Sequence, residues 1–121
     1  MTTTIEKLDG VVNNLTKTKD ITAVAVVSRD GLLMVSNVKS DRAQTFAAMA
    51  ATMFMAAETA TTEIGGWIPE RVVVESDDCK LVTVISNSKS LLVALTGANI
   101  NLGIVLHDMK VAADEVKDIL S

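Results

Sequence analysis

Residues 43–57 read AQTFAAMAATMFMAA, and no side chain in this run is charged. The spacing of its apolar residues predicts a helix that begins after Ser40 or Asp41 and continues to about Ile64. The Gly65-Gly66 pair ends this helix, because glycine adopts the left-handed conformation of a C-cap without a steric penalty. One apolar stripe of the helix is expected to cover a sheet, and it contains Ala43, Phe46, Ala47, Ala50, Phe54, Ala57 and Ile64.

A second apolar stripe on the same helix contains Met49, Met53 and either Ala56 or Ala60. One face is enough to cover a sheet, so the second stripe predicts a helix–helix contact with another copy of the chain. Small alanines allow two backbones to approach closely, and methionine adapts its shape to a partner. The alternative is that both stripes are internal core beneath long loops.

A short valine strand, Arg71–Glu75, follows the helix and has charges only at its two ends. At the edge of a sheet its unpaired backbone groups would accept another strand, and two copies meeting antiparallel would satisfy each other across a two-fold axis. Trp67 lies between helix and strand, either as a lid on the core, which we favour, or as an anchor at the junction. The predicted dimer interface contains Phe46, Met49, Ala50, Met53, Ala57, Arg71, Val72, Val73, Val74 and Glu75.

The rest of the sequence predicts two more helices and four more strands, in a single domain over residues 1–121. Apolar residues recur at spacings of three and four in residues 3–16 and 101–120, which indicates amphipathic helices. Runs of apolar and β-branched residues predict strands at 21–28, 32–37, 80–86 and 91–96, in addition to the valine strand at 71–76. With a tight turn at Asp30-Gly31, the order α-β-β-α-β-β-β-α indicates an α+β fold with antiparallel hairpins.

Composition and charge narrow the class of protein. A hydrophobic fraction of 49% and a charged fraction of 21% are those of a folded chain. The net charge is −4 and aromatic residues make up 2%, so neither a basic surface nor a stacking platform for nucleic acid is expected. Cys79 is the single cysteine, and the N-terminus lacks a signal pattern. These features predict a soluble cytoplasmic protein without direct membrane insertion.

No group of residues predicts catalysis, a cofactor or a metal site. His107 is the only histidine, and the sequence shows no base placed beside Cys79. No phosphate-binding loop is present, and Asp77-Asp78 is expected to be a solvated turn. An arginine finger could come from any of the three arginines, and the sequence singles out none of Arg29, Arg42 and Arg71.

The order of elements and several local phrases resemble the Roadblock/dynein light chain family over nearly the whole chain. The first phrase is AVAVVSRDGL at residues 23–32, and the second is the alanine-rich helix that ends in Gly65-Gly66. The third is the strand Arg71–Glu75, and the last is GANINLG at residues 97–103, which leads into the final helix. The short chain resembles a stand-alone prokaryotic member of the family.

The resemblance implies a profilin-like or longin-like α/β/α sandwich with a five-stranded antiparallel sheet. The first and last helices would share one face, and the second helix would cover the other. Family members usually dimerise through the second helix and third strand, the same two elements that the residue patterns single out.

The resemblance also implies a function without catalytic residues. Family members act as platforms for small Ras-like GTPases, or as adaptors in motor and signalling complexes. We expect a homodimer that modulates the nucleotide cycle or the localisation of such a GTPase. The partner is expected to contact Asp41, Arg42, Thr45 and Ala48, at the start of the second helix. The alternative is a purely structural adaptor subunit that makes no direct GTPase contact.

Overall fold

The computed structural model describes residues 2–121 and contains three helices and five strands. Their bounds along the chain are α1 Thr4–Leu15, β1 Ile21–Ser28, β2 Leu33–Ser36, α2 Arg42–Gly65, β3 Arg71–Glu75, β4 Cys79–Asn87, β5 Ser90–Gly97 and α3 Leu102–Leu120. Every predicted helix and strand is confirmed, with ends that differ by no more than a residue or two. The α+β order predicted from the sequence is therefore correct.

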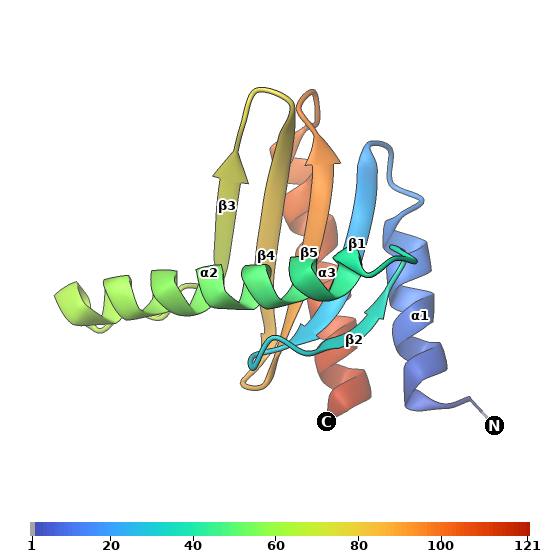
Figure 1. The fold of residues 1–121 in the computed structure, drawn as a ribbon, viewed down its shortest axis with the longest axis horizontal. Helices are drawn as coiled ribbons and strands as arrows, with labels where there is room; N and C mark the ends of the chain where they lie inside the picture. Colours follow the sequence, from blue (N-terminus) through green and yellow to red (C-terminus); the bar gives the residue numbers. More distant parts are fainter. Residues whose placement is uncertain (1) are drawn as a thin grey trace.

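The five strands form one antiparallel sheet in the order β2-β1-β5-β4-β3. The long strands β1, β5 and β4 occupy the middle, where Val26 faces Leu92 of β5. The short strands β2 and β3 are the two edges (Figure 1). This arrangement leaves the valine strand β3 with a neighbour on one side only.

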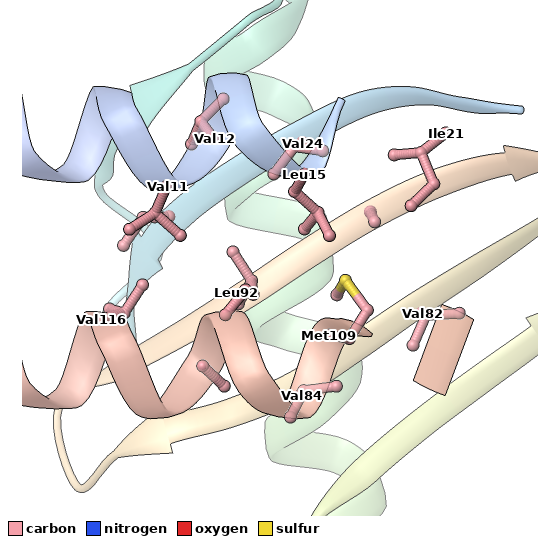
Figure 2. Packing of buried hydrophobic residues seen from close by; sticks show 14 of the residues in the cluster. Val11, Val12, Leu15, Ile21, Val24, Val82, Val84, Leu92, Met109 and Val116 are labelled. Carbon is pink, nitrogen blue, oxygen red and sulfur yellow. The ribbon is translucent and has the colours of Figure 1, made fainter. Parts of the chain in front are cut away.

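Helices α1 and α3 cover one face of the sheet and enclose the larger part of the core (Figure 2). Leu8 and Val12 of α1 and Met109 and Val116 of α3 have almost no exposed surface. The predicted placement of the first and last helices on a common face is confirmed. Thr3 and Asn101 cap the two helices, since their side chains accept bonds from backbone N–H groups three residues further on.

Helix α2 covers the opposite face and packs there mainly through alanine. Its buried residues are Ala43, Ala47, Ala50, Ala51 and Phe54, and the last four pack with Ala25, Val27, Leu91 and Val93 of the sheet. Small side chains bring the helix axis close to the strands, and Phe54 is the one large side chain that α2 inserts. The attachment of α2 to its own sheet therefore depends on a short segment of the helix.

The ends of α2 follow the predicted signals. Ser40, rather than Asp41, provides the side-chain cap, because its hydroxyl accepts a bond from the N–H of Arg42 at 3.3 Å. Gly66 ends the helix in the left-handed conformation, with a φ of 71°, and its N–H bonds back to the carbonyl of Thr62. The chain then turns toward the edge strand β3.

Candidate functional site

The open edge of β3 is the first part of the candidate site. On either side of β3, the carbonyl of Glu70 accepts a bond from the N–H of Ile85 at 3.0 Å, and the N–H of Ser76 donates to the carbonyl of Cys79 at 2.9 Å. Ile85 and Cys79 belong to β4. Because an antiparallel strand directs the backbone groups of alternate residues to opposite sides, the even-numbered residues of β3 bond to β4. The odd-numbered residues, Arg71, Val73 and Glu75, direct their N–H and C=O groups to the open edge. This edge is a template for one more strand.

The C-terminal half of α2 is the second part. From Met55 to Gly65 no residue of the helix is buried. In Figure 1 this half, about 16 Å long at the usual rise per residue, extends past β3 and beyond the sheet. The overhang lies on the same side of the molecule as the open edge, so both could contact one neighbouring molecule.

One stripe of α2, which runs from the part over the sheet into the overhang, is apolar and accessible. Met49 is 58% exposed, while Phe46, Met53 and Ala57 are half-buried. Ala56 and Ala60, the two alternatives for the second stripe, are both exposed. The seam, as we call this stripe, consists of Phe46, Met49, Met53, Ala56, Ala57 and Ala60. The alternative that both stripes are internal core is wrong for the protomer.

Ala50 requires a correction to the predicted interface. It is 2% exposed and packs against the sheet within its own protomer, so it offers almost no surface to a partner. Met53, about one turn further along, belongs to the seam and is half-buried. The sequence predicts Ala50 both on the sheet-facing stripe and in the dimer interface; the first prediction is correct, and the second is wrong for this residue.

Ile64 and Trp67 also differ from the predictions. Ile64, expected on the sheet-facing stripe, is 84% exposed, because α2 has already left the sheet at that point. Trp67, predicted as a lid on the core, is 67% exposed, and Ile68 is 66% exposed. The run from Ile64 to Ile68 contains three large apolar residues in five positions, and none of the predictions above treats them as one exposed cluster.

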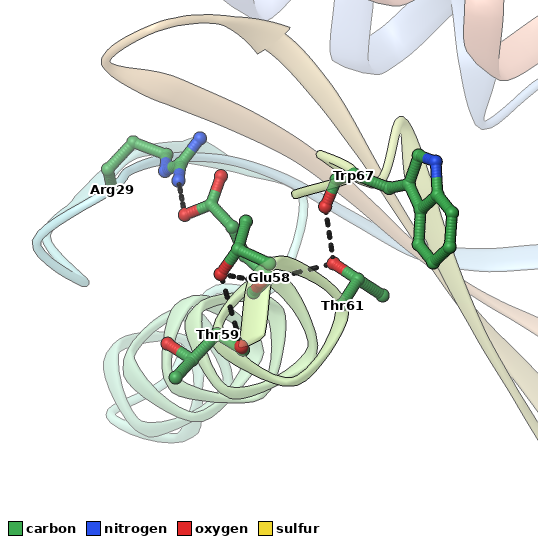
Figure 3. A network of polar contacts seen from close by, with 6 residues as sticks. Arg29, Glu58, Thr59, Thr61 and Trp67 are labelled. Atoms are coloured by element: carbon green, nitrogen blue, oxygen red, sulfur yellow. Dashed lines mark hydrogen bonds and ion pairs between the residues drawn. The ribbon is translucent and has the colours of Figure 1, made fainter. Parts of the chain in front are cut away.

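Trp67 is held in a defined position although it is exposed (Figure 3). Its ring lies so closely against Gly65 that a Cβ atom at that position would overlap the ring. Its carbonyl accepts a bond from the hydroxyl of Thr61 at 2.7 Å. An ordered, exposed tryptophan is a frequent centre of protein–protein interfaces, since little conformational entropy is lost when it is covered.

An ion pair ties the middle of α2 to the end of β1. Arg29 bonds to Glu58 at 2.5 Å (Figure 3). The Arg29 guanidinium also lies 5.1 Å from the centre of the Phe54 ring. Both charged side chains are about three-quarters buried, so Arg29 holds α2 in place and is not available as an arginine finger. Arg42 and Arg71 are exposed and make no ion pair within residues 2–121.

The four predicted partner contacts do not share one environment. Asp41, Arg42 and Thr45 are exposed at the start of α2. Ala48 is half-buried beneath the β1–β2 turn, where a Cβ on Gly31 would lie 3.3 Å from the Ala48 Cα. Ala48 therefore contributes to the attachment of the turn more than to an open surface.

The outward face of α2, opposite its buried stripe, carries no charge between Thr45 and Thr59, and the exposed Glu63 follows about one turn later. Thr45, Thr52 and Thr59 recur there every seven residues and are all exposed. Solvent-facing sides of helices are usually rich in charged residues, so this uncharged face is unusual for a surface in contact with water alone. It is a second accessible surface, distinct from the seam.

Residues that could perform chemistry are dispersed in the part of the chain that the structure describes. No group of three or more His, Cys, Asp or Glu residues could hold a metal ion there. Cys79 is the first residue of β4, and its sulfur lies 3.3 Å from the Ser76 hydroxyl. His107 borders an open groove of about 360 Å³ between α1 and α3. None of the helices within residues 2–121 has the length and apolar character needed to cross a bilayer.

Comparison with known proteins then identifies the family. The family model for the Roadblock/LC7 domain matches residues 7–96. The chain belongs to the Roadblock/LC7 domain family. An uncharacterized protein of Methanocaldococcus jannaschii is similar to this Roadblock/LC7 protein, with 37% identity over 91% of this chain and 96% of its own.

Solved structures with low identity share the fold. A Roadblock/LC7 domain from Streptomyces avermitilis has 24% identity and a TM-score of 0.89, and covers 93% of this chain and 96% of its own. MglB, in a structure described with a tetrameric arrangement, has 18% identity and a TM-score of 0.87 over 96% of this chain and 89% of its own. A profilin from Schizosaccharomyces pombe gives 14% identity and a TM-score of 0.67 over 91% and 96% of the two chains. The predicted profilin-like, five-stranded sandwich is confirmed.

Proposed function

We propose that this Roadblock/LC7 protein is a homodimeric, non-enzymatic platform in the cytoplasm that binds a small Ras-like GTPase and modulates its nucleotide cycle. The proposal is supported by two features that lie on the same side of the molecule. The open edge of β3 has unpaired backbone groups, and the overhang of α2 has uncovered apolar side chains. One neighbouring molecule of the same shape would cover both.

A dimer would cover both features. Another strand would pair with the free backbone groups of the open edge, and an apolar surface would cover the exposed side chains of the overhang. A two-fold axis beside β3 would join the two sheets edge to edge and bring each α2 over the partner's sheet. The seam residues Met49 and Met53 would then meet their counterparts on the partner helix. The tetrameric arrangement described for MglB supports self-association as a property of this fold.

The GTPase proposal rests on family membership together with the outward face of α2. In the dimer two such faces would lie side by side and form a broad uncharged surface, bordered by Asp41 and Arg42 at each helix start. A surface of this kind fits the switch loops of a folded partner better than a basic polymer or a small ion. Because Arg29 is held by Glu58, the platform would act by positioning the GTPase's own groups.

Self-association is tested by two proline substitutions in β3. Val73→Pro removes an N–H that points to the open edge, so it should abolish the dimer and leave the β3–β4 pairing intact. Val74→Pro removes an N–H that bonds to β4, and it should lower the stability of the protomer itself. Analytical ultracentrifugation and thermal unfolding of the two variants separate these effects. A dimer that persists in Val73→Pro and in Met53→Asp would refute the interface.

GTPase binding is tested on the outward face with the dimer left intact. Thr45→Arg and Thr52→Arg should each weaken binding of a Ras-like GTPase from the same organism by at least tenfold, because a bulky charge would lie in the contact. Asn13→Arg, on the exposed side of α1, is the matched control. Calorimetry gives the affinity, and release of a fluorescent nucleotide gives the effect on the cycle. Unchanged binding in both variants, or no binding by the native dimer, would favour the purely structural adaptor.

A further inference from the structure

The charge pattern of β3 is complementary to itself about the centre of the strand. Its sequence is Arg71-Val72-Val73-Val74-Glu75, with one positive and one negative end. When such a strand is turned by a two-fold rotation and laid antiparallel to itself, each end meets the opposite charge.

The direction of the backbone groups selects the register of such a pairing. Arg71, Val73 and Glu75 direct their hydrogen-bonding groups to the open edge. A pairing centred on Val73 sets these outward-facing residues opposite one another, so every outward N–H and C=O group of both strands gains a partner. A two-fold pairing centred on Val72 or Val74 would leave part of these groups beyond the end of the facing strand.

The side chains agree with this register. Residues 71, 73 and 75 share the face of the sheet that carries α1 and α3, since Val73 packs against that cluster. Both Arg71 and Glu75 are exposed and lack an ion pair in the described protomer. In the β3–β4 pairing Glu75 faces Lys80, whereas Arg71 faces the apolar Val84. Unlike Glu75, Arg71 therefore has no opposite charge facing it on β4, and such a charge could come from a second chain.

We propose that β3 pairs antiparallel with β3 of a second copy in the register centred on Val73, and that two reciprocal Arg71–Glu75 pairs make this edge selective for its own sequence. The inference rests on the proposed homodimer and specifies what recognises the partner. An edge strand with another charge order would meet a like charge or an unpaired one, so the pairing disfavours related chains as partners.

Charge reversal tests the register. Arg71→Glu sets two acidic side chains opposite each other at each end of the pairing, and Glu75→Arg sets two basic ones there. Each change should raise the dimer dissociation constant by roughly tenfold or more. The double variant R71E/E75R has the native composition and restores both pairs, so its dissociation constant should return close to the native value. Lys89→Glu, in the β4–β5 turn, reverses a positive charge as Arg71→Glu does but away from the edge, and it should leave the dimer unchanged.

Mixing the two single variants gives the decisive measurement. The R71E and E75R chains repel their own kind and attract each other, so a mixture should form heterodimers well in excess of the statistical proportion, as native mass spectrometry can count. A statistical mixture, or a double variant that remains as weak as the single ones, would overturn the register while the dimer stands. A native chain that sediments as a monomer would overturn the homodimer and the register together.

Discussion

Phe54→Ala is the substitution that should most clearly separate α2 from the rest of the fold. Phe54 has no exposed surface, and the other buried residues of α2 are all alanine. Removal of a buried phenylalanine ring generally lowers the free energy of unfolding by about 3–5 kcal/mol. Here the ring also lies beneath the Arg29 guanidinium, 5.1 Å away, so the ion pair to Glu58 loses its support. We expect a loss near the upper end of that range.

The matched control is Leu8→Ala on the opposite face of the sheet, where Leu8 is 1% exposed. It should lower the free energy of unfolding by about 2–5 kcal/mol without detaching α2. Urea unfolding gives the two losses, and hydrogen exchange shows where protection is lost. Phe54→Ala should expose the amides of α2 first and weaken the dimer, whereas Leu8→Ala should lower protection throughout. A loss below about 1 kcal/mol in Phe54→Ala, or an α2 that keeps its protection, would refute the view that one ring holds the helix.

Three further substitutions have outcomes that follow from single contacts. Gly65→Ala should displace the ring of Trp67, the only tryptophan, and shift its fluorescence, because the new Cβ would overlap the ring. Its control is Gly10→Ala, where nothing lies within 4 Å of the new Cβ. The control should raise the unfolding free energy by up to about 1 kcal/mol and leave the fluorescence unchanged. Arg29→Ala should lower the unfolding free energy by roughly 1–2 kcal/mol, because it removes the ion pair to Glu58 and the contact with the Phe54 ring. If this loss of stability vanishes in high salt, the contact with the Phe54 ring adds nothing. Thr83→Val should leave stability unchanged or raise it by about 1 kcal/mol, since the buried Thr83 hydroxyl has no partner within residues 2–121; a clear decrease would show that the hydroxyl is hydrogen-bonded.

The sequence predicts the helices and strands of this fold because their signals are local. The Asp30-Gly31 turn, the Gly65-Gly66 stop and the polar residues between strands act within a few positions of where they stand. Hydrophobic periodicity assigns most of the inner faces of α1 and α3 correctly, since Leu8 and Val12 of α1 and Met109 and Val116 of α3 are buried. It fails in the first turn of each helix, where Ile5 and Ile104 are 51% and 56% exposed. These features need no knowledge of the distant parts of the chain.

The incorrect burial predictions concern residues whose exposure depends on how far the sheet extends beneath α2. Periodicity places Ile64 on the sheet-facing stripe, but it does not show that the buried part of α2 ends at Phe54, so Ile64 is exposed against prediction. Ala50 is buried on that stripe as predicted, and only its assignment to the dimer interface is wrong. The prediction that Trp67 covers the core fails for the same reason, since a lone large ring is normally buried. The position of an edge strand is a property of topology, and only the three-dimensional arrangement reveals it.

Helix α2 buries small side chains and exposes large apolar ones, and this distribution favours association with another molecule. In most surface helices the large apolar residues face the core and the small or polar ones face water. In α2 the sheet-facing residues are mainly alanine, whereas Met49, Met55 and Ile64 are each more than half exposed. Burial of alanine stabilises a helix far less than burial of methionine or isoleucine, so the protomer gains little by holding the second half of α2. The apolar area that would stabilise this half becomes available only when another molecule covers it. Under the proposed function, the order of the helix and the formation of the GTPase-binding surface would therefore depend on the same event, the pairing of two chains.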